Sequence, residues 1–303
     1  MRTARKLHAD VGGLRILAGS ATVLIAVGLW VVLGATRSHR TARHVPPTFA
    51  GDCRSTSGYG DLTAKQLGSY NHLLVRAPDR LQAVTDPILM GTCTIRINIK
   101  PGDVGGGQTD RAEITGTRTL WRNGDDVWYL LSFMLGPTNP LPAPGGWMLV
   151  DQFFAQDSQN HVSGGSPPFA VEVVPAGGID VDVRGGAKAS ESDPAPRINE
   201  YHVAPATPGV WHSLLIHIKW STANDGLVEV WHRQGTRPFP SAPQVSARGP
   251  NLLTVAGDVL PVYAETGIYR SRTTTDQTVY YAGLFAEPTR SAALKFAALQ
   301  TKR

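Results

Sequence analysis

The fold of this chain is decided by residues 210–232, which read VWHSLLIHIKWSTANDGLVEVWH. Every second position from Leu214 to Trp220 is apolar. Because successive side chains of a β-strand point to opposite faces, this alternation predicts a strand with one buried face. The run Asn224-Asp225-Gly226 predicts a tight turn into a second strand over 227–232. The stretch is therefore predicted to be an antiparallel hairpin.

Strand patterns recur through the rest of the chain. They cover residues 92–100, 111–121, 127–135, 147–152, 170–175, 179–184, 262–270 and 278–286. Helical patterns are confined to 62–75 and 291–299, and the Pro/Gly/Ser-rich stretches 185–209 and 235–250 are predicted to be surface loops. Many short strands without a long helix between them predict an all-β fold, a β-sandwich or jelly roll.

Composition supports a folded protein of 303 residues. Hydrophobic residues make up 42% and charged residues only 17%, a balance that excludes wholesale disorder. The formal charge of +5 depends on the amino terminus, because removing residues 1–35 leaves 25 basic and 23 acidic residues. The body of the chain carries no basic stripe with interleaved aromatics, so no nucleic-acid partner is expected.

The amino-terminal segment predicts export. Residues 16–35 are uncharged and follow a basic leader over 1–15. Their length suits a membrane anchor of ~20 residues, and a long signal peptide stays as the alternative. A linker over 36–50 would then lead to one domain over 51–290, with a tail over 291–303. The protein is expected at the cell surface or outside the cell.

The chain has two cysteines, Cys53 and Cys93. Outside the cytoplasm they are predicted to form a disulfide, which in the chain-entropy model contributes roughly 3–4 kcal/mol. Two buried free thiols are the alternative. No metal-binding motif occurs, so no cofactor is expected, although a structural calcium bound by loop carboxylates stays open.

Polar side chains share faces on several predicted strands. The residues that fall at matching positions are Arg111 and Glu113, His217 and Lys219, and Tyr263, Glu265 and Tyr269, with Gln152 on a further strand. If these rows line one concave sheet, they form a groove of Arg, Gln, His, Lys and Tyr side chains. Such groups suit an anionic sugar, because the Arg fork binds a carboxylate. Each residue taken singly is equally well an ordinary outward-facing sheet residue.

The chain resembles a known family over residues 79–287. The motifs that carry the resemblance are Asp86-Pro87, Pro101-Gly102-Asp103, Arg111-Ala112-Glu113-Ile114, Trp128-Tyr129-Leu130-Leu131-Ser132-Phe133, Gln152-Phe153, Ser166-Pro167-Pro168, Trp211-His212, His217-Ile218-Lys219-Trp220-Ser221, Val228-Glu229-Val230-Trp231 and Gly267-Ile268-Tyr269-Arg270. They look like those of the jelly-roll polysaccharide lyases, the heparin-lyase-like and glucuronan-lyase-like group, and more distantly the alginate lyases. The resemblance implies a concanavalin-A-like β-sandwich.

The resemblance also implies a reaction, the β-elimination of a uronate-containing acidic polysaccharide. Arg111 and Gln152 would bind and neutralise the uronate carboxylate, and Tyr269 would act as acid and also as base. His217 would supply an imidazole if its face is concave, and His161 is a second source from a loop. Further binding groups would be Glu113, Lys219, Tyr263 and Arg270.

Two positions depart from the family pattern. Phe154 stands where the alginate-lyase form has a catalytic histidine, and Glu265 stands where a lysine is usual. Both changes favour the first alternative, a membrane-tethered module that binds acidic glycans without cutting them.

The second alternative is a glycoside hydrolase, which needs two carboxylates flanking the scissile bond. The clearest same-face acidic pair is Asp180 and Asp182. In each case the expected partner is an acidic polysaccharide, with the membrane as a further partner if residues 16–35 are retained, and a monomer is expected.

Overall fold

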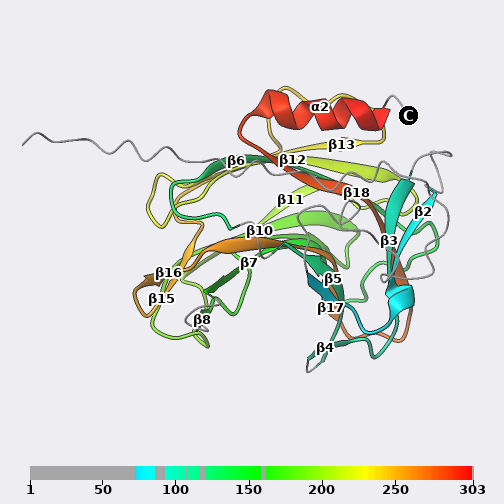
Figure 1. The fold of residues 1–303 in the computed structure, drawn as a ribbon, viewed down its shortest axis with the longest axis horizontal. Helices are drawn as coiled ribbons and strands as arrows, with labels where there is room; N and C mark the ends of the chain where they lie inside the picture. Colours follow the sequence, from blue (N-terminus) through cyan, green and yellow to red (C-terminus); the bar gives the residue numbers. More distant parts are fainter. Residues whose placement is uncertain (1–71, 86–92, 107, 117–119, 158–161, 302–303) are drawn as a thin grey trace, which may run out of the picture. The chain divides into compact units, whose positions relative to one another are not determined.

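The computed structural model describes residues 72–85, 93–106, 108–116, 120–157 and 162–301, all of which belong to one compact unit, Thr41–Arg303. Within these residues the chain forms a β-sandwich of two sheets with one short α-helix (Figure 1). The all-β prediction is confirmed, and this arrangement is the one that a jelly roll requires.

The larger sheet, called the large sheet below, has eleven strands among the described residues, and its main order is β1-β5-β17-β7-β9-β10-β15-β16. Strands β4, β8 and β11 pair at its margins. The bounds are β1 (His72–Leu74), β4 (Val104–Gly106), β5 (Thr109–Thr115), β7 (Met148–Asp157), β8 (Val162–Ser163), β9 (Phe169–Val173), β10 (Gly178–Lys188), β11 (Arg197–Pro205), β15 (Leu253–Val255), β16 (Asp258–Val259) and β17 (Val262–Ser271).

The second sheet, called the small sheet, has seven strands among the described residues in the order β14-β13-β12-β6-β18-β3-β2. The bounds are β2 (Leu81–Thr85), β3 (Cys93–Ile99), β6 (Asp126–Leu135), β12 (Trp211–Lys219), β13 (Leu227–Gln234), β14 (Val245–Arg248) and β18 (Gln277–Glu287), and a 3₁₀ turn, η2 (Pro78–Arg80), precedes β2. The hairpin predicted over 210–232 is confirmed, because β12 pairs with β13 in antiparallel register.

The core lies between the two sheets and follows from the alternation. Leu214, Ile216 and Ile218 of β12 belong to one core cluster with Val171 and Val181 of the large sheet, and all five are fully buried. An aromatic group adds to this layer, with ring centroids 4.7 Å apart for Tyr129–Phe153, 5.1 Å for Trp121–Tyr129 and 5.6 Å for Phe153–Trp220. Burying one large apolar side chain contributes roughly 1.5–3 kcal/mol, so this layer dominates the stability.

The helix α2 (Arg290–Thr301) covers the outer face of the small sheet (Figure 1). The hydroxyl of Thr289 accepts a hydrogen bond from the Ala292 amide at 3.2 Å, which caps the first turn. Phe296 stacks on Phe285 of β18 at 4.3 Å. The helix predicted over 291–299 is confirmed. Since α2 takes one side of the sandwich, the outer face of the large sheet is directed away from it.

Three local predictions are wrong in part. Residues 245–248 lie inside the expected loop 235–250 but form β14, because they pair with β13. Residues 72–74, at the end of the expected helix 62–75, form strand β1, because they pair with β5. Residues 197–205 lie inside the expected loop 185–209 but form β11, which pairs with β10 along its length. The sequence of β11 is largely polar, and pairing with a neighbouring strand decides its state.

Several predictions lie outside the described residues. These are the basic leader over 1–15, the anchor or signal segment over 16–35, the linker over 36–50, the disulfide partner Cys53, residues 62–71 of the expected helix, and His161. Among the described residues no helix is long and apolar enough to cross a membrane.

Gly267 creates a bulge in β17 that only glycine fits. Its φ is +151°, and a Cβ atom there would lie 2.3 Å from the Ala112 carbonyl oxygen on β5. Pairing with β7 shifts by one residue at this point, between Thr266 and Tyr269. The Tyr281 hydroxyl, from the small sheet, lies 2.8 Å from the carbonyl oxygens of Val150 and Gly267 and holds the bulge from across the core.

Replacing Gly267 by alanine is expected to lower the free energy of unfolding by about 2–5 kcal/mol, because backbone strain and a backbone clash act together. Urea unfolding measures this loss. Gly257→Ala is the matched control, since Gly257 has a φ of +94° but open space around its Cβ position. An equal loss in the two variants would contradict the role assigned to the β5 contact.

Candidate active site

The outer face of the large sheet brings together Arg111, Gln152 and Tyr269. Tyr269 of β17 is paired in register with Arg111 of β5. The Arg111 guanidinium carbon lies 4.1 Å from the centroid of the Tyr269 ring, so the two side chains share a face. Gln152 of β7 is paired with Glu265, four residues before Tyr269 on β17. The expected convergence of these three residues is therefore present in the structure.

Two carboxyl groups share the Gln152 amide. Gln152 Nε2 donates to Glu113 Oε1 at 2.9 Å and to Glu265 Oε2 at 2.8 Å. Arg111 Nε lies 2.9 Å from Glu113 Oε2, and a terminal nitrogen of Arg111 lies 4.0 Å from Glu265 Oε2. Glu113, Gln152 and Glu265 are each at most 3% exposed. We call these four residues the Arg–Glu cluster.

Burial dominates the electrostatics of the Arg–Glu cluster. It raises the pKa of Glu265 to about 8, and the neighbouring Glu113 charge adds to the shift while Arg111 opposes it. Burial likewise raises the pKa of Glu113, against Arg111 and the Gln152 amide. Beneath the cluster, on the inner face of β7, burial holds the pKa of Asp151 well above its usual range. The Asp151 carboxyl accepts a hydrogen bond from Thr266 Oγ1 at 2.6 Å.

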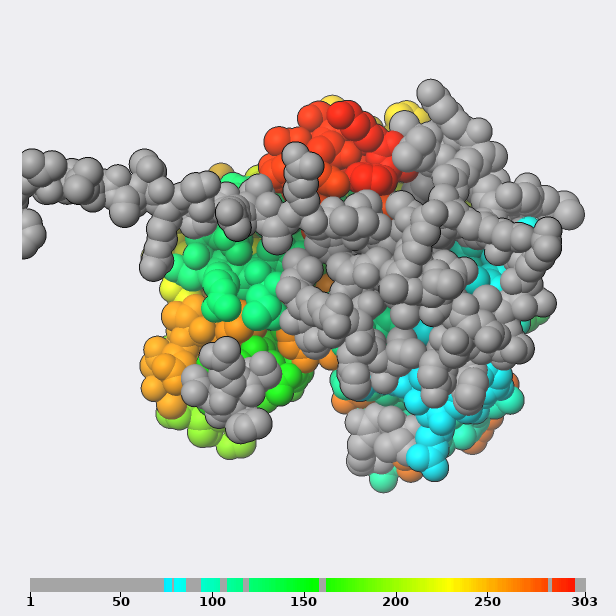
Figure 2. Space-filling view, viewed as in Figure 1, coloured from blue at the N-terminus to red at the C-terminus, as the bar shows by residue number. Residues whose placement is uncertain are grey.

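Aromatic side chains line the cluster at both ends. Trp147 meets the Tyr269 ring edge-on at a centroid distance of 4.9 Å. At the other end Phe154 meets Tyr263 at 6.0 Å, and the Tyr263 hydroxyl donates to Gln156 Oε1 at 3.0 Å. Burial raises the pKa of Tyr263, so its hydroxyl is a hydrogen-bond donor at neutral pH. Figure 2 shows the surface hollowed on the side away from α2, between the end with β15 and β16 (orange) and the end that carries cyan atoms of residues 72–85.

Acidic residues follow on the strands beyond β7. Pairing aligns Gln152 with Ala170 of β9, Ala170 with Asp182 of β10, and Asp182 with Glu200 of β11. At ~4.8 Å per strand, Asp182 lies about 10 Å across the face from Gln152. Burial and the charges of Asp182, Glu200 and Asp180 raise the pKa of Glu172 to about 7. This acidic end of the face comprises Glu172, Asp180, Asp182 and Glu200.

Asp180 and Asp182, the acidic pair considered for hydrolysis, are both engaged. Asp182 is 1% exposed and pairs with Arg184 at 2.5 Å, while Asp180 lies 2.8 Å from His202 Nδ1. Among the described residues no group of three or more His, Cys, Asp or Glu side chains is arranged to hold a metal ion.

His217 and Lys219 lie elsewhere, which corrects the expected groove. They belong to β12 of the small sheet and point to its outer face, the face against which α2 packs. The His217 ring stacks on Trp128 at 4.1 Å, and its nitrogens lie 2.7 Å from Asp126 and 3.1 Å from Glu229. The core therefore separates His217 from Tyr269, so it does not supply an imidazole to this face.

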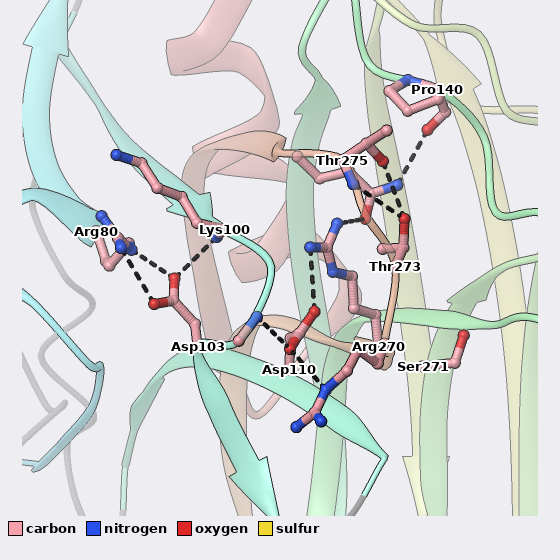
Figure 3. A network of polar contacts seen from close by, with 12 residues as sticks. Arg80, Lys100, Asp103, Asp110, Pro140, Arg270, Ser271, Thr273 and Thr275 are labelled. Carbon is pink, nitrogen blue, oxygen red and sulfur yellow. Dashed lines mark hydrogen bonds and ion pairs between the residues drawn. The ribbon is translucent and has the colours of Figure 1, made fainter.

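Arg270 is the second correction. It follows Tyr269 on β17 and therefore points to the opposite face of the strand. Its guanidinium is 1% exposed, donates to Gln277 Oε1 at 2.7 Å and to Asp110 Oδ2 at 3.2 Å, and lies in a polar network at the margin of the core (Figure 3). The network positions strand ends and does not reach the outer face of the large sheet.

Sequence reasoning missed several members of this face. Trp147, Gln156, Glu172 and Glu200 were not singled out, and Asp180 and Asp182 were considered only as a hydrolytic pair, because strand parity indicates which face a residue takes and not which strands are neighbours. Glu265 was noted as a departure, and its pairing with Glu113 through Gln152 became visible only from the register of β5, β17 and β7.

Comparisons with known proteins agree with this fold. The family model for polysaccharide lyase matches residues 55–284. An endo-β-1,4-glucuronan lyase from the fungus Trichoderma reesei is similar in structure, with a TM-score of 0.56 and 17% identity over 74% of this chain and 92% of that chain. This likeness shows a shared fold.

Two further structures are more distant. The alginate lyase A1-II′, a member of polysaccharide lyase family 7, has a TM-score of 0.46 and 13% identity over 74% of this chain and 86% of that chain. A GH131 β-glucanase catalytic domain from Podospora anserina has a TM-score of 0.46 and 16% identity over 77% and 90%. No curated protein matches the chain significantly. Because the family match spans well over half of its residues, this protein belongs to the polysaccharide lyase family.

Proposed function

We propose that the protein cleaves a uronate-containing acidic polysaccharide by β-elimination outside the cytoplasm. The observation that carries the proposal is the stacking of Arg111 on Tyr269 at 4.1 Å on the outer face of the large sheet. A cation for the uronate carboxylate then stands beside a hydroxyl that can exchange protons with the sugar. Membership of the polysaccharide lyase family supports the same reaction.

Arg111 is the group proposed to bind the uronate carboxylate. Its Nε is turned to Glu113, and its side chain is 22% exposed. The terminal nitrogens of the guanidinium are then the ones available to fork onto a carboxylate. Neutralising that carboxylate acidifies the C5 proton, because the enolate-like state that forms on its removal is stabilised by the same donors.

Tyr269 is proposed to move the protons. A base takes the C5 proton, the C4–O bond breaks, a C4–C5 double bond forms, and an acid protonates the departing oxygen. Phe154 occupies the position where related lyases have a histidine, and His217 lies on the other sheet. Tyr269 is therefore proposed for both steps, as phenolate base and then as phenol acid.

The acidic end of the face bears on the choice of polymer. Glu172, Asp180, Asp182 and Glu200 would repel a second carboxylate placed over β9–β11, and Arg184 offsets only one of them. A polymer in which uronates alternate with sugars lacking a carboxylate is therefore expected to be cleaved faster than a homopolymer of uronates.

The test is an assay of the full-length protein on a panel of polyuronates, glycosaminoglycans and a neutral glucan. Cleavage by elimination produces a C4–C5 double bond, which absorbs in the ultraviolet. We expect product from uronate polymers, most from alternating ones, and none from the glucan. Binding of uronate polymers without product on any of them would instead favour the tethered glycan-binding module, which Phe154 and Glu265 made the leading alternative.

Export and anchoring complete the proposal. The support is the uncharged run 16–35 after a basic leader. Outside the cytoplasm Cys53 and Cys93 are proposed to pair. Mass spectrometry of non-reduced peptides from the natural host tests the disulfide, and its absence would contradict this part alone.

A further inference from the structure

The Gln152 amide has no donor left for a substrate. Both of its N–H bonds point to carboxyl groups, Glu113 at 2.9 Å and Glu265 at 2.8 Å. Reversing the amide would place its oxygen against the same two acceptors, so the hydrogen-bond network fixes this orientation. The resemblance to known lyases assigned Gln152 to the uronate carboxylate, and the structure gives it another task.

That task is to hold two acidic groups together in a buried place. Both carboxyl groups are within hydrogen-bond reach of one nitrogen atom, and both residues are at most 3% exposed. Two ionised carboxylates so close repel each other and lose the hydration that each needs, and sharing one proton relieves both costs.

The charges that face the pair can be named strand by strand. β5 supplies Arg111, and β17 supplies Tyr263 and Tyr269. β7 supplies Gln152, with Asp151 on its inner face, where burial raises its pKa well above the usual range. Among the described residues of this neighbourhood Arg111 is the one cation. With both glutamates ionised the Arg–Glu cluster would carry a net charge of −1, and with one proton bound it is neutral.

We propose that the pair Glu113 and Glu265 holds one proton in the state of the protein that binds a uronate, that Glu265 carries it, and that Gln152 is the positioning residue that bridges the two carboxyl groups. Arg111 lies 2.9 Å from Glu113 but 4.0 Å from Glu265, so Glu113 is the group that stays ionised. The Tyr263 hydroxyl lies beside the Glu265 carboxyl, and this contact opposes the rise in the Glu265 pKa that burial and Glu113 cause.

Loss of this proton changes what the site can bind. A uronate carboxylate meets a neutral cluster below the titration and a negative one above it. Binding should therefore weaken as the pH rises past about 8, the pKa to which burial and Glu113 raise Glu265. The added charge also opposes the enolate-like state that Arg111 stabilises, so the loss is expected in kcat/KM as a whole.

The proton itself can be tested without activity, by thermal unfolding of full-length wild type and Glu265→Gln between pH 5 and pH 9. The folded-state pKa of Glu265 is raised above its unfolded value, so the wild type holds a proton that unfolding releases. Its stability is then highest at low pH and is lost as the pH rises toward about 8. We expect the melting temperature of wild type to fall with rising pH relative to that of Glu265→Gln. The difference in slope should correspond to the release of about one proton on unfolding. Glu191→Gln, in an exposed loop, is the matched control and should follow wild type.

The binding consequence rests on the proposed function and is tested by kinetics on the best uronate polymer. At pH 9, one unit above a midpoint of about 8, wild-type kcat/KM should be about ten-fold lower than at pH 6. In Glu265→Gln, which cannot lose a proton there, the ratio between the two pH values should stay within about two-fold. Gln152→Met removes the N–H donors that favour the charged carboxylates, so it should move the midpoint upward, a shift that a purely structural residue would not cause.

The outcomes separate the two proposals. Parallel pH–stability curves for wild type and Glu265→Gln would overturn the shared proton. An alkaline loss of kcat/KM that is equal in both proteins would overturn its role in binding. A wild type that releases the proton but cleaves no polymer would support the shared proton and contradict the proposed function.

Discussion

Replacing Tyr269 by phenylalanine is expected to lower kcat on a uronate polymer by about 10²–10⁴-fold, the usual loss when one proton-transfer group is removed. The ring that stacks on Arg111 and meets Trp147 is retained, so KM should change by less than a few-fold. The measurement is steady-state kinetics of double-bond formation, accompanied by polymer binding to the variant.

The matched control is Tyr280→Phe, which removes a hydroxyl from a tyrosine of β18 in the small sheet. It should leave both constants near the wild-type values. If Tyr269→Phe retained kcat, the hydroxyl would not be the proton-transfer group, and the base and acid would have to be sought elsewhere on this face.

Replacing Arg111 by alanine is expected to lower kcat/KM by about 10²–10³-fold, through both kcat and KM. The fork that binds the uronate carboxylate would be lost, and this carboxylate is the group whose neutralisation acidifies C5. The change also leaves the buried Glu113 without its cation, so its pKa should rise further and the fold should lose about 1–3 kcal/mol.

Two comparisons separate binding from folding. Arg111→Lys keeps the charge without the fork and should recover part of the affinity. Arg184→Ala is the matched control, because Arg184 is similarly exposed and pairs with the buried Asp182 on the same face, about three strands from Tyr269. Equal losses in Arg111→Ala and Arg184→Ala would indicate a general effect of removing charge from the face and would contradict the assigned role.

The strand pattern could be predicted because alternation is local. A two-residue period is visible in the letters themselves, so the hairpin of β12 and β13 and the long strands around it are apparent without a structure. The same parity placed Arg111 with Glu113, and Glu265 with Tyr269. The polar strand β11 could not be found in this way, because its partner β10 and not its composition holds it in the sheet.

Parity has a limit that His217 and Arg270 illustrate. It states that a side chain is on one of two faces, and it does not state which sheet carries the strand. His217 has the outward parity expected of a groove residue, yet its strand lies in the small sheet and the core separates it from Tyr269. Arg270 is adjacent to Tyr269 in the chain, and for that reason it turns to the other face and pairs with Asp110.

By itself, the sequence determined the all-β class, the main strands and helix α2, and the family pattern that carries Arg111, Gln152 and Tyr269, because these depend on neighbours within a few residues. Only the tertiary structure decided that both N–H groups of the Gln152 amide donate to Glu113 and Glu265, and that His217 lies on the other sheet. Those contacts join residues that are far apart in the chain. Gln152 and Glu265 are separated by 113 positions. Their register is set by the Gly267 bulge and by packing across the core, and neither is a property of any short stretch of sequence.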